Sequence, residues 1–260
     1  MHIQKVSAIY FSPTGHTREL VKYIAESFAS GVQFYNLTSY EQGVLQKSFS
    51  AEELVVLGVP VYGGRIPALA AERMAQLKGQ QTPVIILVTY GNRDYEDALL
   101  ELKTILEQQQ FVVVGAAALV TEHSIVHEVG HDRPDKRDWR QIDEFVSQIK
   151  IKLGKVQEGQ ALSPIHVKGN QPFRNYNGIP LKPKANKECV SCGFCARECP
   201  AHAIDPAHPR KTDKKRCISC MRCVTYCPQQ ARYVNKLLMK MVASKLKKSC
   251  SQRRENDFSV

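Results

Sequence analysis

Residues 189–228 contain one cysteine pattern twice: Cys189-x2-Cys192-x2-Cys195-x3-Cys199-Pro200, and then Cys217-x2-Cys220-x2-Cys223-x3-Cys227-Pro228. In bacterial iron–sulfur runs of this form, three closely spaced cysteines bind one cluster and the fourth binds the other cluster of the pair. The repeat therefore predicts two [4Fe–4S] clusters with crossed fourth ligands. The expected ligands are Cys189, Cys192, Cys195 and Cys227 for the first cluster, and Cys217, Cys220, Cys223 and Cys199 for the second.

Two other uses of cysteine fit parts of this pattern. Structural zinc also uses Cys-x2-Cys pairs, but usually as two pairs per ion rather than four cysteines in one run. Disulfides need an oxidising compartment, and the polar, charged start of the chain predicts no secretory signal. The spacing favours clusters over both, and this stretch resembles the two-cluster ferredoxins. Cys250 lies outside the pattern in a lysine-rich tail and is interpreted as a free surface thiol.

Length and charge limit the number of domains and the kinds of partner that this chain can have. With 260 residues the chain is long enough for about two domains. No apolar run reaches the length of a membrane span, so we expect a soluble, cytoplasmic protein without a transmembrane segment. The net charge of +11 is concentrated towards the C-terminus, which favours a partner with an acidic surface; a solvated face is the alternative. Nucleic acid is disfavoured as a partner, because the basic residues are not interleaved with aromatic ones. The oligomeric state is left open.

A phosphate-binding loop is predicted near the N-terminus. The apolar segment Gln4–Phe11 suits a buried parallel strand, and it ends at the sequence Ser12-Pro13-Thr14-Gly15-His16-Thr17 before a helical pattern begins. Backbone N–H groups, hydroxyls and the positive end of a helix dipole would converge there on an anion. The loop contains no lysine or arginine, so it suits a monoester phosphate held by neutral donors. The alternative is an ordinary N-capped helix, which would need only one Ser or Thr.

Strands and helices alternate through the first 150 residues. This alternation predicts an α/β fold, a doubly wound five-stranded parallel sheet whose ligands bind outside the carboxyl ends of the strands. The unusual loops that start at Ser12, Pro60 and Tyr90 all follow strand ends, so they are expected to meet in space. The expected strands are Gln4–Phe11, Val32–Leu37, Glu53–Val59, Pro83–Thr89 and Phe111–Val120, and the expected helices are Leu20–Phe28, Ala68–Leu77, Leu99–Leu106 and Trp139–Leu153.

From residue 3 to about residue 153 the chain resembles flavodoxin, and the Ser-x-Thr-Gly-x-Thr loop carries this resemblance. The resemblance implies bound FMN, with the ring between the second and third loops, where aromatic side chains stack and glycines allow close backbone approach. A core or hinge role is the alternative for each tyrosine taken singly. The implied FMN residues are Ser12, Thr14, Gly15, His16 and Thr17 at the phosphate, and Pro60, Val61, Tyr62, Gly63, Gly64, Thr89, Tyr90, Gly91, Asn92 and Tyr95 at the ring.

Three histidines, His123, His127 and His131, recur at four-residue intervals after the last strand. On a helix they would share one face and could bind a metal, but Gly130 and Pro134 argue against a long helix there. Surface or domain-contact roles are the alternative.

The sequence divides into four parts: a flavodoxin-like domain (1–153), an extended Pro- and Gly-rich linker (154–187), a small α+β two-cluster ferredoxin domain (188–232) and a basic amphipathic helix with a tail (233–260). The apolar stripe of that helix is expected to pack on its own protein; contact with a membrane is the alternative.

Over nearly its full length the chain resembles the flavodoxin–ferredoxin fusion proteins, which are found mainly in anaerobes. The resemblance implies an electron-transfer flavoprotein or oxidoreductase that passes single electrons between an external redox protein, two [4Fe–4S] clusters and FMN. No proton donor or nucleophile is evident, so a pure carrier and an enzyme both remain open. One alternative is an NAD(P)H- or ferredoxin-dependent flavin or quinone reductase acting on a small acceptor, although no nicotinamide-binding fingerprint is present. The other alternative is a non-catalytic module that senses redox state or acts as a scaffold.

Overall fold

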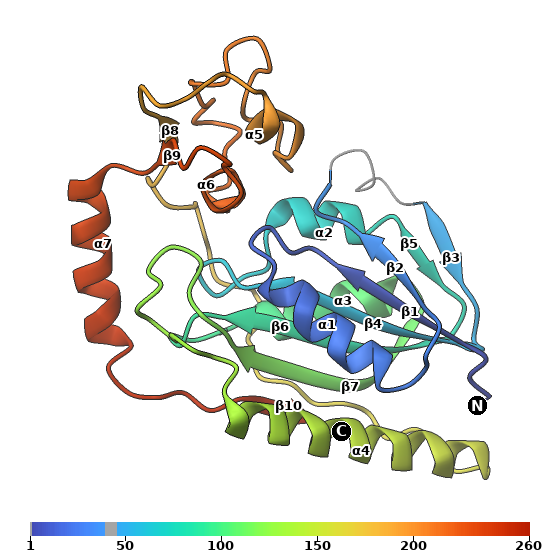
Figure 1. Cartoon of the computed structure of the whole chain (residues 1–260). Coiled ribbons are helices and arrows are strands. Elements are labelled where there is room, and N and C mark those ends of the chain that lie inside the picture. Colours follow the sequence, from blue (N-terminus) through green and yellow to red (C-terminus); the bar gives the residue numbers. More distant parts are fainter. Residues whose placement is uncertain (1, 40–45) are drawn as a thin grey trace.

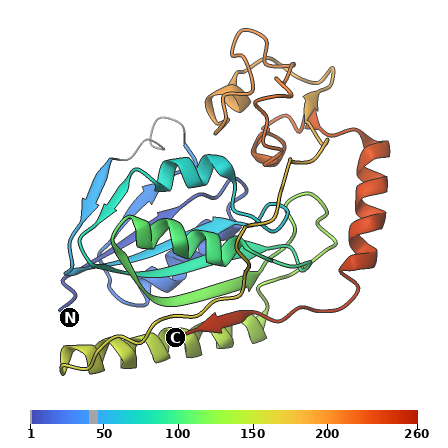
Figure 2. The same cartoon turned by 180° about the vertical axis from the view of Figure 1, so that it is seen from behind.

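A computed structural model describes residues 2–39 and 46–260 (Figure 1). Residues 2–39 and 46–153 form a sheet with helices on both faces, and residues 180–235 form a smaller unit at one end of it (Figures 1 and 2). The main sheet has six strands in the order β10-β7-β6-β4-β1-β2. These strands are β1 (Lys5–Tyr10), β2 (Val32–Asn36), β4 (Glu53–Pro60), β6 (Thr82–Tyr90), β7 (Phe111–Val120) and β10 (Asp257–Ser259).

The five strands expected from the sequence pair in parallel. Counted among themselves they have the order 2-1-3-4-5, which is the flavodoxin-like doubly wound order. The fold class is therefore confirmed, but the count of five strands is wrong. The sixth strand, β10, pairs antiparallel with β7, because the end of the chain returns to the sheet edge and matches Phe258 with Ala117.

Alternate side chains along the strands point to opposite faces of the sheet and contribute to two hydrophobic cores. One core lies under α2 (Ala68–Met74) and α3 (Ala98–Gln108), and the other lies under α1 (His16–Glu26) and α4 (Lys136–Gln157). On β4, for example, Leu57 points to the first core and Val56 to the second, as the two-residue period of a strand requires. A separate pair, β3 (Lys47–Phe49) and β5 (Leu77–Gly79), lies beside the main sheet.

The smaller unit contains β8 (Lys184–Ala185) paired antiparallel with β9 (Arg232–Tyr233), and two single-turn helices, α5 (Phe194–Arg197) and α6 (Arg222–Thr225). It is followed by α7 (Lys236–Ser249). Of the predicted apolar stripe, Val242 packs on the protein, as does the neighbouring Met239, whereas Leu237 and Met241 are exposed. The expectation that the stripe packs on its own protein is therefore met only in part. None of the helices in the described ranges combines the length and apolar character needed to cross a bilayer.

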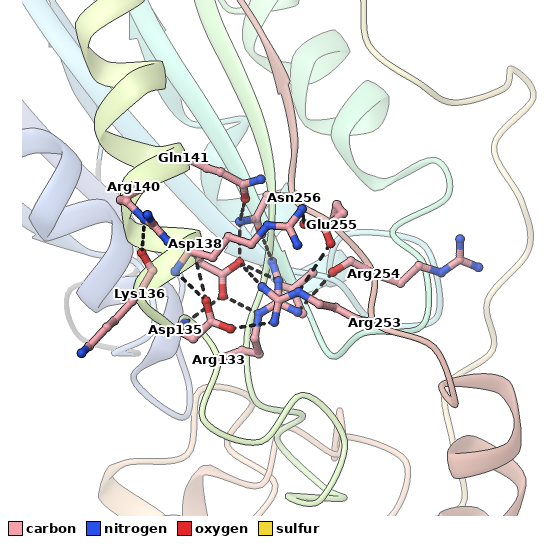
Figure 3. Close-up of polar contacts among 12 residues, drawn as sticks. Arg133, Asp135, Lys136, Asp138, Arg140, Gln141, Arg253, Arg254, Glu255 and Asn256 are labelled. Atoms are coloured by element: carbon pink, nitrogen blue, oxygen red, sulfur yellow. Dashed lines mark hydrogen bonds and ion pairs between the residues drawn. The ribbon is translucent and has the colours of Figure 1, made fainter.

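The C-terminal segment, residues 250–260, is fastened to the N-terminus of α4 (Figure 3). Asp138 is fully buried there, forms an ion pair with Arg133, and accepts a hydrogen bond from Asn256 Nδ2 at 2.9 Å. Arg253 donates to Asp135 Oδ2 at 2.6 Å. This network holds β10 against the sheet and ties the end of the chain to the first domain.

Candidate functional site

The eight cysteines of the repeated pattern surround two cavities. Arg232 also lines the first cavity, whereas Met221 and Arg222 line the second. We call the two cavities the first and second cysteine sites. The grouping is the one that crossed fourth ligands require, and it supports the ligand assignment, which stays a prediction. The cysteines are Cys189, Cys192, Cys195 and Cys227 at the first site, and Cys199, Cys217, Cys220 and Cys223 at the second.

The two halves of the pattern repeat the same backbone conformations 28 residues apart. Left-handed φ angles occur at Ser191 (56°) and Ser219 (56°), and the residue before each short helix is also left-handed, Gly193 at 72° and Met221 at 61°. The crossed cysteines also repeat a contact, which is a backbone N–H donated to sulfur. It joins Ala203 N to Cys199 Sγ and Ala231 N to Cys227 Sγ, each at 3.3 Å. Donors aimed at sulfur are what a cluster-ligating thiolate needs, so the residues present fit the cluster.

Buried Arg232 connects the two cysteine sites electrostatically. Burial raises the pKa of the Cys223 thiol to about 11, and the Arg232 guanidinium acts in the opposite direction. Burial likewise raises the pKa of Cys195, and Arg232 again opposes this rise. Since cysteine binds metal as the thiolate, Arg232 favours the binding form at both sites.

The loops at the carboxyl ends of four strands enclose a third cavity, which we call the loop cavity. The three loops expected to meet do meet there. Nine of the predicted FMN residues line it: Thr14, His16, Thr17, Pro60, Val61, Tyr62, Thr89, Tyr90 and Gly91.

Ser12 and Gly15 shape the phosphate loop from outside the cavity lining. Ser12 is buried, and its hydroxyl accepts the Arg18 N–H at 3.0 Å, which caps the first turn of α1. Gly15 has φ 103°, a conformation that disfavours any residue with a Cβ. Further in, the Thr17 and Thr89 hydroxyls are 2.7 Å apart and link the first loop to the third. The loop thus has the turn, the hydroxyls and the helix start that a phosphate monoester needs.

The structure places Gly63 and Gly64 away from the loop cavity. A Cβ on Gly63 would lie 2.2 Å from the ring of Tyr176, so the linker covers that residue. The Gly64 carbonyl accepts the Asp97 N–H at 3.0 Å and is held within the protein.

Asn92 and Tyr95 also lie outside the cavity lining, and their side chains form hydrogen bonds with the C-terminal segment. Asn92 Nδ2 donates to the carbonyls of Cys250 and Gln252 at 3.2 and 2.9 Å, and the Tyr95 hydroxyl bonds Asp257. Tyr90 is among the residues that line the cavity, but its ring packs against that of Tyr95 and its hydroxyl donates to the Glu255 carbonyl.

Sequence reasoning missed the fourth wall of the loop cavity, which residues 121–124 form directly after β7. Here His123 Nδ1 accepts the backbone N–H groups of Ile125 and Val126, each at 3.1 Å, and burial lowers the pKa of His123 to about 4. The signal was available, because these residues follow a strand end as the other three loops do.

His123, His127 and His131 have hydrogen-bond partners within the protein. His127 and His131 bond the two oxygens of Glu122, at 2.6 and 3.1 Å, while His123 turns inward. No three His, Cys, Asp or Glu side chains in residues 2–39 and 46–260 are placed to hold one metal ion. The three histidines do not share one helical face, because residues 121–135 form turns and loops rather than a helix.

Residues 174–232 match the family model described as a 4Fe-4S dicluster domain. No curated protein matches the sequence. Among solved structures, the chain is similar to rubredoxin oxygen:oxidoreductase from Desulfovibrio gigas (16% identity, TM-score 0.43), with 61% of this chain and only 38% of that one covered. It is also similar to a flavodoxin from the domain Archaea (12%, TM-score 0.38, 58% and 99% covered) and to flavodoxin 1 from Bacillus cereus (14%, TM-score 0.39, 57% and 98% covered).

The assignment of the first domain rests on its strand order rather than on these likenesses. By that order and by the family match, the chain joins a flavodoxin-like domain to a 4Fe-4S dicluster domain, which is the arrangement of a flavodoxin–ferredoxin fusion protein.

Proposed function

We propose that the chain is an electron-transfer flavoprotein that holds FMN in the loop cavity and one [4Fe–4S] cluster at each cysteine site. When bound, the flavin accepts two electrons and releases them singly, and each cluster carries one. The observation that carries the proposal is the grouping of eight cysteines around two cavities on the same chain as a loop cavity at the carboxyl ends of a flavodoxin-like sheet.

The protein's own residues bind and tune these groups. The start of α1, with Thr14, His16 and Thr17, would hold the phosphate, and Tyr62 and Tyr90 would flank the ring. Arg232 and the backbone donors to Cys199 and Cys227 stabilise negative charge on sulfur. The external partner we propose is a redox protein with an acidic surface, which suits the net charge of +11.

A second candidate function, reduction of a small acceptor at the flavin, is favoured by one observation. Glu122 lines the loop cavity, and its carboxylate bonds two histidines, His127 and His131, whose side chains are mostly exposed. Such a group can move a proton between the cavity and solvent, which a two-electron reduction needs and a pure carrier does not. Steady-state turnover with quinones, compared between the wild type and Glu122→Gln, distinguishes the two functions.

The test of the proposed function is a stopped-flow experiment under anaerobic conditions. Oxidised holoprotein is mixed with a dithionite-reduced, acidic bacterial two-[4Fe–4S] ferredoxin. We expect the iron–sulfur absorbance to change in a phase whose rate rises with ferredoxin concentration. The flavin should then bleach in a phase whose rate is independent of ferredoxin concentration, because transfer within one chain is first order. A flavin that stays oxidised while the iron–sulfur absorbance bleaches would show that the clusters are structural or sensory.

A further inference from the structure

The second cysteine site is the one that rests on the flavodoxin-like domain. Its α6 lies against the phosphate loop: Arg222 Nη1 donates to the Pro13 carbonyl at 3.1 Å. The Tyr226 hydroxyl lies 3.2 Å from where a Cβ on Gly15 would be. Both side chains come from the second cysteine run, so that run is held at the edge of the loop cavity.

Two further contacts fix the same face. Ile218, which lines the second site, packs against the core under α2 and α3. The carbonyl of Pro200, another lining residue, accepts Arg73 Nη2 at 2.7 Å, and this bond is buried. The interface thus combines apolar packing with a buried hydrogen bond and is built as a fixed contact rather than a loose tether.

The linings of the second site and the loop cavity are in direct contact, because Arg222 lines the second site, Pro13 lines the loop cavity, and Arg222 Nη1 donates to the Pro13 carbonyl. Tyr62 also lines the loop cavity. The linker residue Tyr176 covers Gly63, the next residue in the chain. The second site is therefore the cysteine site whose lining contacts the lining of the loop cavity.

The first cysteine site has a contrasting, open environment. Cys192 is exposed, and Val190 beside it is 64% exposed. Two arginines bond the backbone of this site: Arg210 Nη2 donates to the Cys189 carbonyl at 2.8 Å, and Arg197 Nη1 donates to the Cys192 carbonyl at 3.3 Å. Lys187 precedes Cys189 by two residues and Lys211 directly follows Arg210; both lysines are exposed, as is the acidic Glu188.

We infer that the two cysteine sites have different roles: the second exchanges electrons with the flavin, and the first is the entry site, where an acidic one-electron redox protein docks over Cys192. This inference rests on the proposed function and adds the order of the sites and the place of the partner. In the reductive direction, each encounter oxidises the partner by one electron, which passes from the first site to the second and on to the flavin. Two encounters supply the two electrons that a flavin accepts.

The test compares two variants that change the net charge by the same amount. Lys187→Glu/Lys211→Glu reverses charge at the proposed entry site, and Lys245→Glu/Lys248→Glu reverses it on exposed positions of α7. The first readout is the Kd of oxidised acidic two-[4Fe–4S] ferredoxin for each holoprotein, measured by calorimetry at low ionic strength, which needs no turnover. The second is the ferredoxin-dependent rate in the stopped-flow experiment.

We expect the entry-site variant to weaken binding and to slow the ferredoxin-dependent phase by roughly tenfold, with both effects reduced at high salt. The α7 variant should stay within about twofold of the wild type, and the first-order flavin phase should be unchanged in both. Equal losses in the two variants, or a larger loss in the α7 variant, would overturn the assigned docking surface. Failure of the proposed function looks different, since the wild type itself would then lack the first-order flavin phase.

Discussion

Replacing Cys199 by alanine is expected to empty the second cysteine site and to leave the first one loaded, although Cys199 belongs to the first sequence run. The reason is geometric: Cys199 lines the cavity formed by Cys217, Cys220 and Cys223. Iron should fall from about eight to about four per chain. Because the second site is the one that contacts the flavodoxin-like domain, flavin bleaching by reduced ferredoxin should be lost entirely. Iron analysis, EPR of the reduced protein and stopped-flow absorbance measure these outcomes.

Two further variants serve as controls for this prediction. Cys250→Ala is the matched control, because Cys250 lies outside both cysteine sites; it should retain all the iron and the flavin phase. Cys227→Ala is the mirror variant and should empty the first site while the second stays loaded. If Cys199→Ala instead lost the cluster whose EPR signal also disappears in Cys192→Ala, the crossed assignment would be wrong, because Cys192 lines the first site.

Replacing Asp138 by alanine is expected to destabilise the first domain by about 3–5 kcal/mol, because it leaves the buried Arg133 guanidinium without its ion-pair partner. The same carboxylate accepts hydrogen bonds from Asn256 Nδ2 and from the backbone N–H of Asp135, at 2.9 and 2.8 Å (Figure 3). Its loss should therefore also loosen the C-terminal segment. Urea unfolding followed by far-UV circular dichroism gives the change in free energy of unfolding.

The control is Glu144→Ala on the same helix, where the side chain is exposed; its effect should stay within about 0.5 kcal/mol. Limited proteolysis provides a second readout: residues 250–260 should be cleaved faster in Asp138→Ala than in Glu144→Ala. A free-energy change for Asp138→Ala as small as that of the control would show that the buried network does not hold the domain together.

Local patterns predicted most of the first domain because its central strands are long and buried on both faces. Glu53–Pro60 and Thr82–Tyr90 are nearly continuous apolar runs, and such runs mark central parallel strands. The strand β10 could not be found in the same way. It has three residues and no periodicity, and it forms only because Phe258 packs on Phe145 while Asn256 and Asp257 bond residues of the first domain.

The candidate site was predictable where motifs are local. The cysteine spacing and the phosphate loop each lie within a few residues, and the positions of loops at strand ends follow from the sheet. The structure differs where distant segments compete for a residue: Tyr176 of the linker covers Gly63, and the C-terminal segment binds Asn92 and Tyr95. Those contacts span more than 100 residues and leave no trace in the local pattern.

The division of the chain into domains at residues 153, 187 and 232 stays a prediction, and the structure adds detail at its joints. The helix α4 continues to Gln157, beyond the expected end of the first domain. The linker is fastened rather than free, because Asp97 accepts the backbone N–H groups of Asn170 and Arg174, at 2.9 and 2.8 Å. A fastened linker suits a fixed distance between the flavin and the cysteine sites.

The central claim, that one chain carries a flavin and two clusters, is tested most directly by a redox titration of anaerobically purified protein, followed by visible and EPR spectroscopy. The predicted result is one FMN and about eight iron atoms per chain, with two interacting cluster signals and a flavin that is reduced within the same titration. Protein that contains no flavin, or only about four iron atoms, would contradict the account.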